Sequence, residues 1–253
     1  LIMSFYSSLI KKAEEIASRY NKRLTLVDTD EASFTYRVSA FSEPQCYVIT
    51  NQPNVKLFYW GLIPFEILPE NGTEKAKKEA VAEAEKIRKT MYNIPAENLY
   101  KKMVLLNPVN HQRCIIPVTG YYDWHTNNDD FSKIPYYFHP ANDDFFSIAG
   151  VWEVWQNPVT EQGIHTFAQI TTAANPFVRK IHNGGKNAYR MPLILNKEDE
   201  EKWLDPELPK EEIQKLLKPF PEKLMDAYPI SPDFLKKNKH DPTILDENIK
   251  VYD

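Results

Sequence analysis

The feature that most restricts the fold of this sequence is a series of short runs rich in β-branched and aromatic residues. Asp, Asn and Pro residues, which favour turns, separate the runs. Short runs with turn signals between them predict antiparallel sheet. The runs form two groups, at 24–27, 34–41, 46–50 and 55–60 and at 114–124, 135–139, 145–155 and 164–172.

Two helices are predicted in the first half of the chain. Apolar residues from Leu9 to Tyr20 recur at helical spacing, with Ser8 as the N-cap. Residues 73–89 are rich in Ala, Glu and Lys, which predicts a solvated surface helix. We interpret this second helix as an insertion.

The second half ends in two short helices and a polar tail. Asn196 caps a helix that ends at Leu204, and Pro209 begins another that Pro219 stops. The tail beyond Pro229 is predicted to be extended. No internal repeat or linker divides the sequence, so we predict one α+β domain.

Composition and glycine placement exclude several classes of function. Thirty-one Lys and Arg residues against 35 Asp and Glu residues give a net charge of −4, so any nucleic-acid binding must be local. The seven glycines form no GxGxxG, GxxxxGK[ST] or GxSxG motif, and there is no HExxH. We therefore expect no dinucleotide site, P-loop or serine-hydrolase elbow, and no metal or other cofactor.

The cysteines and the hydropathy pattern point to the cytoplasm. Cys46 and Cys114 form neither a CxxC pair nor a disulfide framework, and both are interpreted as packed strand residues. No run approaches the roughly 18 apolar residues of a membrane span, and the start of the sequence lacks the order of a secretory signal. The sequon Asn71-Gly72-Thr73 is accordingly interpreted as a turn.

Four segments combine polar side chains with apolar surroundings in a way that a plain core does not need. One of them seats Asp123 between aromatic residues, where burial would raise the pKa of the carboxyl. Another carries His182 within the strongest local basic patch, formed by Arg179, Lys180, Lys186 and Arg190, where a phosphate backbone would lie. The segments are Trp60-Gly61-Leu62-Ile63-Pro64, Asn93-Ile94-Pro95-Ala96-Glu97, Gly120-Tyr121-Tyr122-Asp123-Trp124 and Ile181-His182-Asn183 with Arg190-Met191-Pro192.

In this order, the segments resemble the SRAP family, the SOS-response-associated peptidase domain, from about Met3 to the C-terminus. The strongest stretch, Arg113-Cys114-Ile115-Ile116-Pro117 through the Asp123 segment, is similar to the family's RC-[IL]-[IV]-P...G-[FY]-[FY]-E-W block. The Trp60 segment matches the family's WGLIP turn, and the His182 segment matches its IH...RMP segment. We therefore predict a single α+β domain over residues 3–253, with mostly antiparallel sheets curled into a barrel-like core and peripheral helices.

The resemblance implies chemistry on single-stranded DNA that contains an abasic site. Family members expose an N-terminal cysteine whose amine and thiol condense with the abasic aldehyde into a thiazolidine crosslink, and a peptidase activity that processes their own N-terminus is associated with them. The family's supporting Asn, catalytic Glu and proton-shuttling His match Asn93, Asp123 and His182. The residues expected to bind DNA through phosphate contacts and base stacking are Trp60, Tyr122, Arg179 and Arg190.

Three positions depart from the family pattern. Ser4 stands at the cysteine position, after Met3 and two further residues. A serine hydroxyl is a much poorer nucleophile than a thiol, and an internal residue has no free amine for an imine. Pro95 replaces the arginine of the family's NAR motif, which removes one phosphate contact, and Asp123 is one methylene shorter than glutamate.

Structural roles stay open for the same residues. Asp123 fits a satisfied strand-end carboxylate, His182 a loop or helix-end histidine, and Asn93 the start of an Asx turn. Strand alternation places Tyr122 on one face and Tyr121 with Asp123 on the other, so at most one aromatic pair can line the site.

Three functional hypotheses follow. The leading one is an SRAP-type protein of the DNA damage response that captures abasic sites through an N-terminal nucleophile, which would be Ser4 here. The alternative is a degenerate SRAP paralogue that binds single-stranded DNA without chemistry. An unrelated hydrolase using Asp123 and His182 lacks an identifiable nucleophile. We expect a monomer whose partner is single-stranded DNA with an abasic site.

Overall fold

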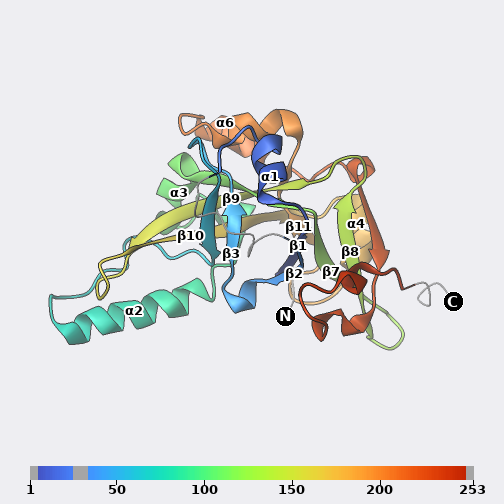
Figure 1. Cartoon of the computed structure of the whole chain (residues 1–253), viewed down its shortest axis with the longest axis horizontal. Coiled ribbons are helices and arrows are strands. Elements are labelled where there is room, and N and C mark those ends of the chain that lie inside the picture. The colour runs from blue at the N-terminus through green and yellow to red at the C-terminus, as the bar shows by residue number, and fades with distance from the viewer. Residues whose placement is uncertain (1–4, 25–33, 249–253) are drawn as a thin grey trace.

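The computed structural model describes residues 5–24 and 34–248, so Ser4 and positions 25–27 of the first predicted run lie outside it. Two β-sheets occupy the middle of the molecule, and helices lie around them (Figure 1). Most strand pairs are antiparallel, and the larger sheet is mixed. The α+β prediction is confirmed.

The smaller sheet is antiparallel and runs in the order β13-β8-β7-β1-β2. Its first strand β1 lies between β7 and β2, which places the beginning of the described chain inside the sheet. Its members are β1 (Tyr6–Leu9), β2 (Thr35–Ser39), β7 (Gly120–Thr126), β8 (Lys133–Pro140) and β13 (Met225–Pro229).

The larger sheet is centred on two long strands that cross the molecule, β9 (Phe146–Gln156) and β10 (Gly163–Ala173) (Figure 1). The order is β12-β9-β10-β4-β3, with β5 and β11 also paired to β10 and β6 to β9. β10 is parallel to β4 and β5 and antiparallel to β9 and β11. The other members are β3 (Gln45–Val48), β4 (Lys56–Trp60), β5 (Asn93–Pro95), β6 (Arg113–Val118), β11 (Arg190–Pro192) and β12 (Ile194–Leu195).

The barrel-like core is not confirmed. An isolated bridge between Ile49 and Ile115 brings the chain just after β3 beside β6. Within the described residues, however, the strand pairing leaves both sheets open.

The two faces of β10 belong to different parts of the core. Ala168 and Ile170 pack into one apolar cluster, whereas Phe167 packs into another that contains Trp60 and Tyr121. Since side chains alternate along a strand, Gln169 and Thr171 lie on the Phe167 face, between the two sheets. Both are buried polar residues.

Six α-helices lie outside the sheets in the described part of the chain. The helix predicted at 73–89 is α2, which begins after Thr73, whose hydroxyl accepts a hydrogen bond of 3.3 Å from the Ala76 amide. α2 lies beside the projecting ends of β9 and β10 (Figure 1), and Ala76, Ala80 and Ala84 are buried, so it is not solvated on every face. The helices are α1 (Ala13–Arg19), α2 (Glu74–Arg88), α3 (Leu106–His111), α4 (Pro176–Ile181), α5 (Glu200–Leu204) and α6 (Lys210–Leu216).

The opening helix begins later than its periodicity predicts. Residues 6–9 form strand β1, and α1 starts only after Lys12. Ser8 is therefore not an N-cap. Its buried hydroxyl lies 2.9 Å from both Thr119 Oγ1 and Tyr137 Oη, partners more than a hundred positions away.

The predicted strand at 114–124 is two strands in different sheets. β6 ends at Val118 and pairs with β9, whereas β7 begins at Gly120 and pairs with β1 and β8. Gly120 is required there, because a Cβ atom would lie 2.4 Å from the ring of Tyr137.

The tail beyond Pro229 is not simply extended. It forms two 3-10 turns, η7 (Pro232–Leu235) and η8 (Pro242–Leu245). Ile230, Phe234 and Ile244 are buried against Tyr122 and Trp124. The tail is polar on average, but three well-spaced apolar residues suffice to dock it.

Candidate active site

Two of the predicted site residues meet in the core. His182 is the first residue beyond α4, and its amide donates a 2.7 Å hydrogen bond to the Val178 carbonyl. Asp123 lies on β7. His182 Nε2 is 3.5 Å from Asp123 Oδ1, and both residues are buried. The structure thus joins a helix end to the middle of a strand through a pair of titratable groups.

The backbone fixes the orientation of the imidazole. His182 Nδ1 lies 3.0 Å from the Arg190 carbonyl oxygen, which can only accept a hydrogen bond, so Nδ1 carries a proton. Nε2 therefore faces the Asp123 carboxyl group.

Asn93 lies on the neighbouring sheet. It begins β5 and sits opposite Gln169 of β10 in a parallel pair, so the Asx-turn alternative is wrong. Phe5, the first described residue, packs with its ring centroid 6.0 Å from that of Tyr92, the residue before Asn93. The beginning of the described chain therefore lies beside the Asn93 segment.

Two further polar side chains are buried between the sheets, each with one atom that has no hydrogen-bond partner among the described residues. Tyr121 Oη and Gln169 Oε1 are both buried and have no hydrogen-bond partner in the described part of the protein. Burial, together with the charge of Asp123, holds the pKa of Tyr121 well above its usual range. Buried groups of this kind are rare in folded proteins and concentrate at functional sites.

Arg190 already has protein partners. Its Nη1 and Nη2 donate to Glu97 at 3.1 and 2.9 Å, and Nη2 also donates to the Thr171 carbonyl at 2.8 Å. The guanidinium holds the pKa of Glu97 below its usual range. A DNA phosphate at Arg190 would therefore compete with a carboxylate. Glu97 has no local sequence signal for this role, because its partner lies 93 positions away.

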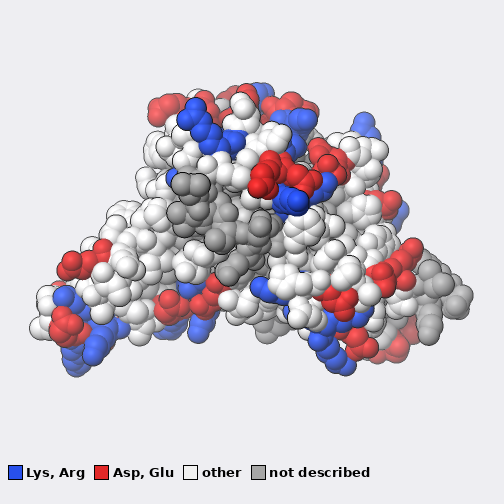
Figure 2. Space-filling view, viewed as in Figure 1, with Lys and Arg blue, Asp and Glu red and all other residues white. Residues whose placement is uncertain are grey.

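Arg179 is the more available cation of the predicted patch. It is exposed on α4, and its guanidinium carbon lies 4.5 Å from the ring centroid of Tyr189. Lys180 and Lys186 are exposed as well, and within the described residues none of these three cations forms an ion pair. On the face drawn in Figure 2, acidic and basic side chains are mixed, which agrees with the expectation that any basic region is local.

The two aromatic residues predicted to stack on bases are buried. Trp60 has no exposed surface, and its Nε1 donates a 3.0 Å hydrogen bond to the Tyr92 carbonyl. Tyr122 is also buried, stacks on Phe234 and donates its hydroxyl proton to the Tyr36 carbonyl. Stacking needs an open ring face, so neither ring fits that role in this structure. Tyr122 and Trp124 do share one cluster, and Tyr121 packs in another, as strand alternation predicted.

The structure also bears on Cys114, on metal binding and on membrane spans. Cys114 is buried as predicted, and desolvation raises the pKa of its thiol well above the usual value. Among the described residues, no group of three or more His, Cys, Asp or Glu side chains is placed to hold a metal ion. No helix in residues 5–24 and 34–248 is both long and apolar enough to span a bilayer.

Comparison with known proteins decides the family. A model of the SOS response associated peptidase (SRAP) family matches residues 3–236. The chain belongs to the SRAP family. Its relatives include two proteins of Bacillus subtilis, the abasic site processing protein YoqW, 31% identical over 190 residues, and the abasic site processing protein YoaM, 34% identical over 175 residues. The YoqW match covers 75% of each chain, and the YoaM match covers 68% of this chain and 66% of YoaM.

A solved structure has the same fold. The crystal structure of a protein from Bacteroides thetaiotaomicron is similar with a TM-score of 0.86 and 38% sequence identity, and the match covers 96% of this chain and 99% of that one. The match of the family model confirms the SRAP resemblance predicted from the motifs. The motifs succeeded because the WGLIP turn, the Asp123 strand and the His182 segment each need particular residues at particular backbone positions. Gly61 is one example, since its φ of 112° and a Cβ position only 2.7 Å from Arg88 Cγ exclude any side chain.

Proposed function

We propose that this SRAP protein processes abasic sites in single-stranded DNA, with the Asp123–His182 pair as its proton-transfer centre. The pair is the observation that carries the proposal, because it is buried, its imidazole is fixed by the Arg190 carbonyl, and the Tyr121 hydroxyl, which has no hydrogen-bond partner among the described residues, feels the charge of Asp123. The family membership and the names of the relatives support the substrate. His182 would move the proton that opens the abasic sugar to its aldehyde.

Covalent capture needs a nucleophile at position 4 with a free α-amine. The amine and the aldehyde form an imine and release water, and the side chain of the same residue then adds to the imine carbon. A cysteine thiol closes a thiazolidine ring, whereas the Ser4 hydroxyl would close an oxazolidine. The hydroxyl is the poorer nucleophile, so we expect the serine form to capture DNA weakly or not at all.

A second candidate function follows from Ser4. A chain with the same fold and basic patch but no thiol would bind abasic sites in single-stranded DNA without covalent chemistry. The two functions differ in one observable, which is a bond that survives denaturation.

The test compares two versions of the chain that begin at Met3, one with Ser4 and one with Ser4→Cys. Intact mass first establishes that Met3 has been removed from both. Each is incubated with a single-stranded oligonucleotide carrying an abasic site and run on a denaturing gel. The control oligonucleotide carries a tetrahydrofuran, which has no aldehyde.

We expect a crosslink with Ser4→Cys only, and only on the aldehyde-bearing DNA. A crosslink of equal yield from the Ser4 chain would show that serine is a competent nucleophile and would remove the non-covalent alternative. Absence of a crosslink from the Ser4→Cys chain, with DNA binding intact, would argue against the proposed chemistry.

A further inference from the structure

Tyr189 combines an exposed ring with an unusual backbone conformation. Its side chain is 43% exposed, and its φ is 63°, in the left-handed region that bulky residues seldom adopt. Such conformations cost free energy and persist where the surrounding structure enforces them, often at ligand-binding segments. An exposed ring held in such a conformation is a candidate for ligand binding.

The backbone of Tyr189 is held by two hydrogen bonds, one of them to His182. Its amide donates a 2.9 Å hydrogen bond to the His182 carbonyl, and its own carbonyl accepts a 2.8 Å hydrogen bond from the Ala174 amide. The next residue, Arg190, supplies the carbonyl that fixes the His182 imidazole. The ring therefore starts from a backbone position that is set relative to the proton-transfer centre.

The Tyr189 ring contacts a cation and still reaches solvent. The Arg179 guanidinium carbon lies 4.5 Å from the ring centroid. Tyr189 is nevertheless 43% exposed, so this contact does not close the ring off from solvent. Within the described residues, Arg179 has no carboxylate partner, so the stacked pair carries a net positive charge.

We propose that Tyr189, backed by Arg179, is a stacking platform for a nucleobase adjacent to the abasic site, an inference that rests on the proposed function. An abasic nucleotide offers no base of its own, so its position in the site must be read from the neighbouring nucleotides. An exposed tyrosine face binds any base, and a guanidinium behind it attracts the nearby phosphate. The platform takes over the stacking role that the buried Trp60 and Tyr122 cannot fill.

The test measures binding of single-stranded oligonucleotides by fluorescence anisotropy. With an oligonucleotide that has one tetrahydrofuran between normal nucleotides, Tyr189→Ala should weaken binding about 5- to 100-fold, the range expected for loss of one base–aromatic stack. Tyr189→Phe keeps the ring and should bind like the wild type. Phe131→Ala removes another exposed aromatic ring at positive φ and should leave binding unchanged.

A second oligonucleotide separates base stacking from other causes. When the nucleotides flanking the tetrahydrofuran also lack bases, Tyr189→Ala and wild type should bind equally, because the platform has nothing to stack on. Weakening that persists on this DNA would overturn the platform and indicate that the ring only holds the loop. Equal affinities of Tyr189→Ala and wild type on the first oligonucleotide would overturn it as well.

The outcomes also distinguish the platform from the proposed function. Wild-type protein that binds no single-stranded DNA would overturn both. Binding that depends on Tyr189, together with no crosslink from the Ser4→Cys chain, would support the platform and count against the covalent chemistry.

Discussion

His182 shows how the surroundings of one side chain fix its orientation. Its ring is held by a backbone carbonyl on one side and faces Asp123 on the other, so its tautomer is set before any substrate arrives. Preorganised proton transfer of this kind contributes to rate and little to ground-state binding.

In the Ser4→Cys chain, His182→Ala should slow crosslinking about 10²- to 10⁴-fold while affinity for the tetrahydrofuran oligonucleotide changes little. Gel time courses give the rate and anisotropy gives the affinity. His125→Ala is the matched control, because His125 lies on the same strand as Asp123 and contacts the Ile181 carbonyl instead. A parallel loss of rate and affinity would make His182 a binding or folding residue.

Glu153 should make stability depend on pH. It is 3% exposed on β9, and burial, with a contribution from the charge of Glu66, raises its pKa from 4.5 to about 7. Between about pH 4.5 and 7 the folded protein therefore retains a proton that the unfolded chain releases, so the free energy of unfolding falls as pH rises. The loss is at most about 3 kcal/mol and is complete above pH 7.

Glu153→Gln should remove this slope and raise the free energy of unfolding at pH 8. Urea unfolding at pH 5 and pH 8 measures both effects. Glu161→Gln, in the exposed turn between β9 and β10, is the control for loss of a surface carboxylate. A slope that survives Glu153→Gln would assign the pH dependence to another group.

At the scale of elements, the connection between α4 and β11 is a closed loop. The backbone bonds of Tyr189 and Arg190 return to His182, and Asn183 fastens the loop to the end of β7. Asn183 Oδ1 accepts from the Thr126 amide at 2.8 Å, and Nδ2 donates to the Thr126 carbonyl at 2.9 Å. The loop that carries the proposed platform is thus tied to the strand that carries Asp123.

Asn183→Ala should release this attachment and lower the free energy of unfolding by about 1–3 kcal/mol, since two partly buried backbone groups lose their partners. Hydrogen exchange of residues 183–189 should quicken more than that of β9. Asn127→Ala, which removes an exposed hydrogen bond to Ser132, is the comparison. Unchanged exchange in the loop would mean that packing alone holds it.

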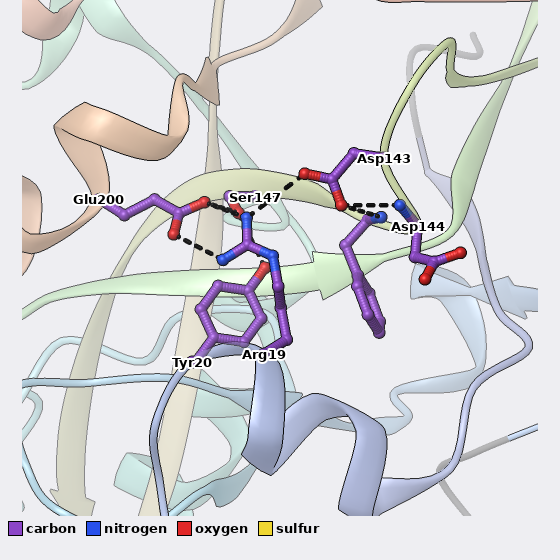
Figure 3. A network of polar contacts seen from close by, with 7 residues as sticks. Arg19, Tyr20, Asp143, Asp144, Ser147 and Glu200 are labelled. Carbon is purple, nitrogen blue, oxygen red and sulfur yellow. Dashed lines mark hydrogen bonds and ion pairs between the residues drawn. The ribbon is translucent and has the colours of Figure 1, made fainter.

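At the scale of the whole molecule, a largely buried ion pair joins the beginning of the chain to its last third. Arg19 at the end of α1 forms two hydrogen bonds with Glu200 of α5, at 3.0 and 2.8 Å. Ser147 donates to the same carboxylate at 2.6 Å, and the Tyr20 hydroxyl lies 2.8 Å from the Ser147 oxygen (Figure 3). Asp143 approaches the guanidinium from the opposite side. The network fixes α1 against both the sheet and α5.

Breaking one side of this pair should cost more than replacing both. Arg19→Met leaves the Glu200 carboxylate without its cation and should lower the free energy of unfolding by about 3 kcal/mol, whereas adding Glu200→Leu should recover part of the loss. Urea unfolding of the two single variants and the double variant gives the coupling. Lys77→Met, which breaks an exposed pair with Glu74, should cost little. Additive losses at Arg19 and Glu200 would show that the two residues do not depend on each other.

Local sequence patterns were sufficient to predict strands and helices whose residue preferences are repeated over many positions. The strand runs around β3, β4, β8, β9 and β10, the helix α2 and the short helices α5 and α6 all follow from propensity and turn signals. The order of the SRAP motifs identified the family, because special backbone positions such as Gly61 admit few residues. The motifs also selected Asp123 and His182, which the structure brings into contact.

Only the tertiary structure decided which side chains of each helix and strand are buried, which are exposed and which residues they contact. Ser8 has the chemistry of an N-cap, yet buried partners on β7 and β8 hold it in a strand. Trp60 and Tyr122 have the chemistry of stacking residues, yet their burial leaves no ring face open for a base. Tyr189, which belongs to none of the motifs, has an exposed ring and follows His182 by seven residues. Arg190 has the chemistry of a phosphate ligand, yet Glu97 is its partner. Each outcome depends on contacts between residues far apart in the chain, and local sequence carries no information about those distances.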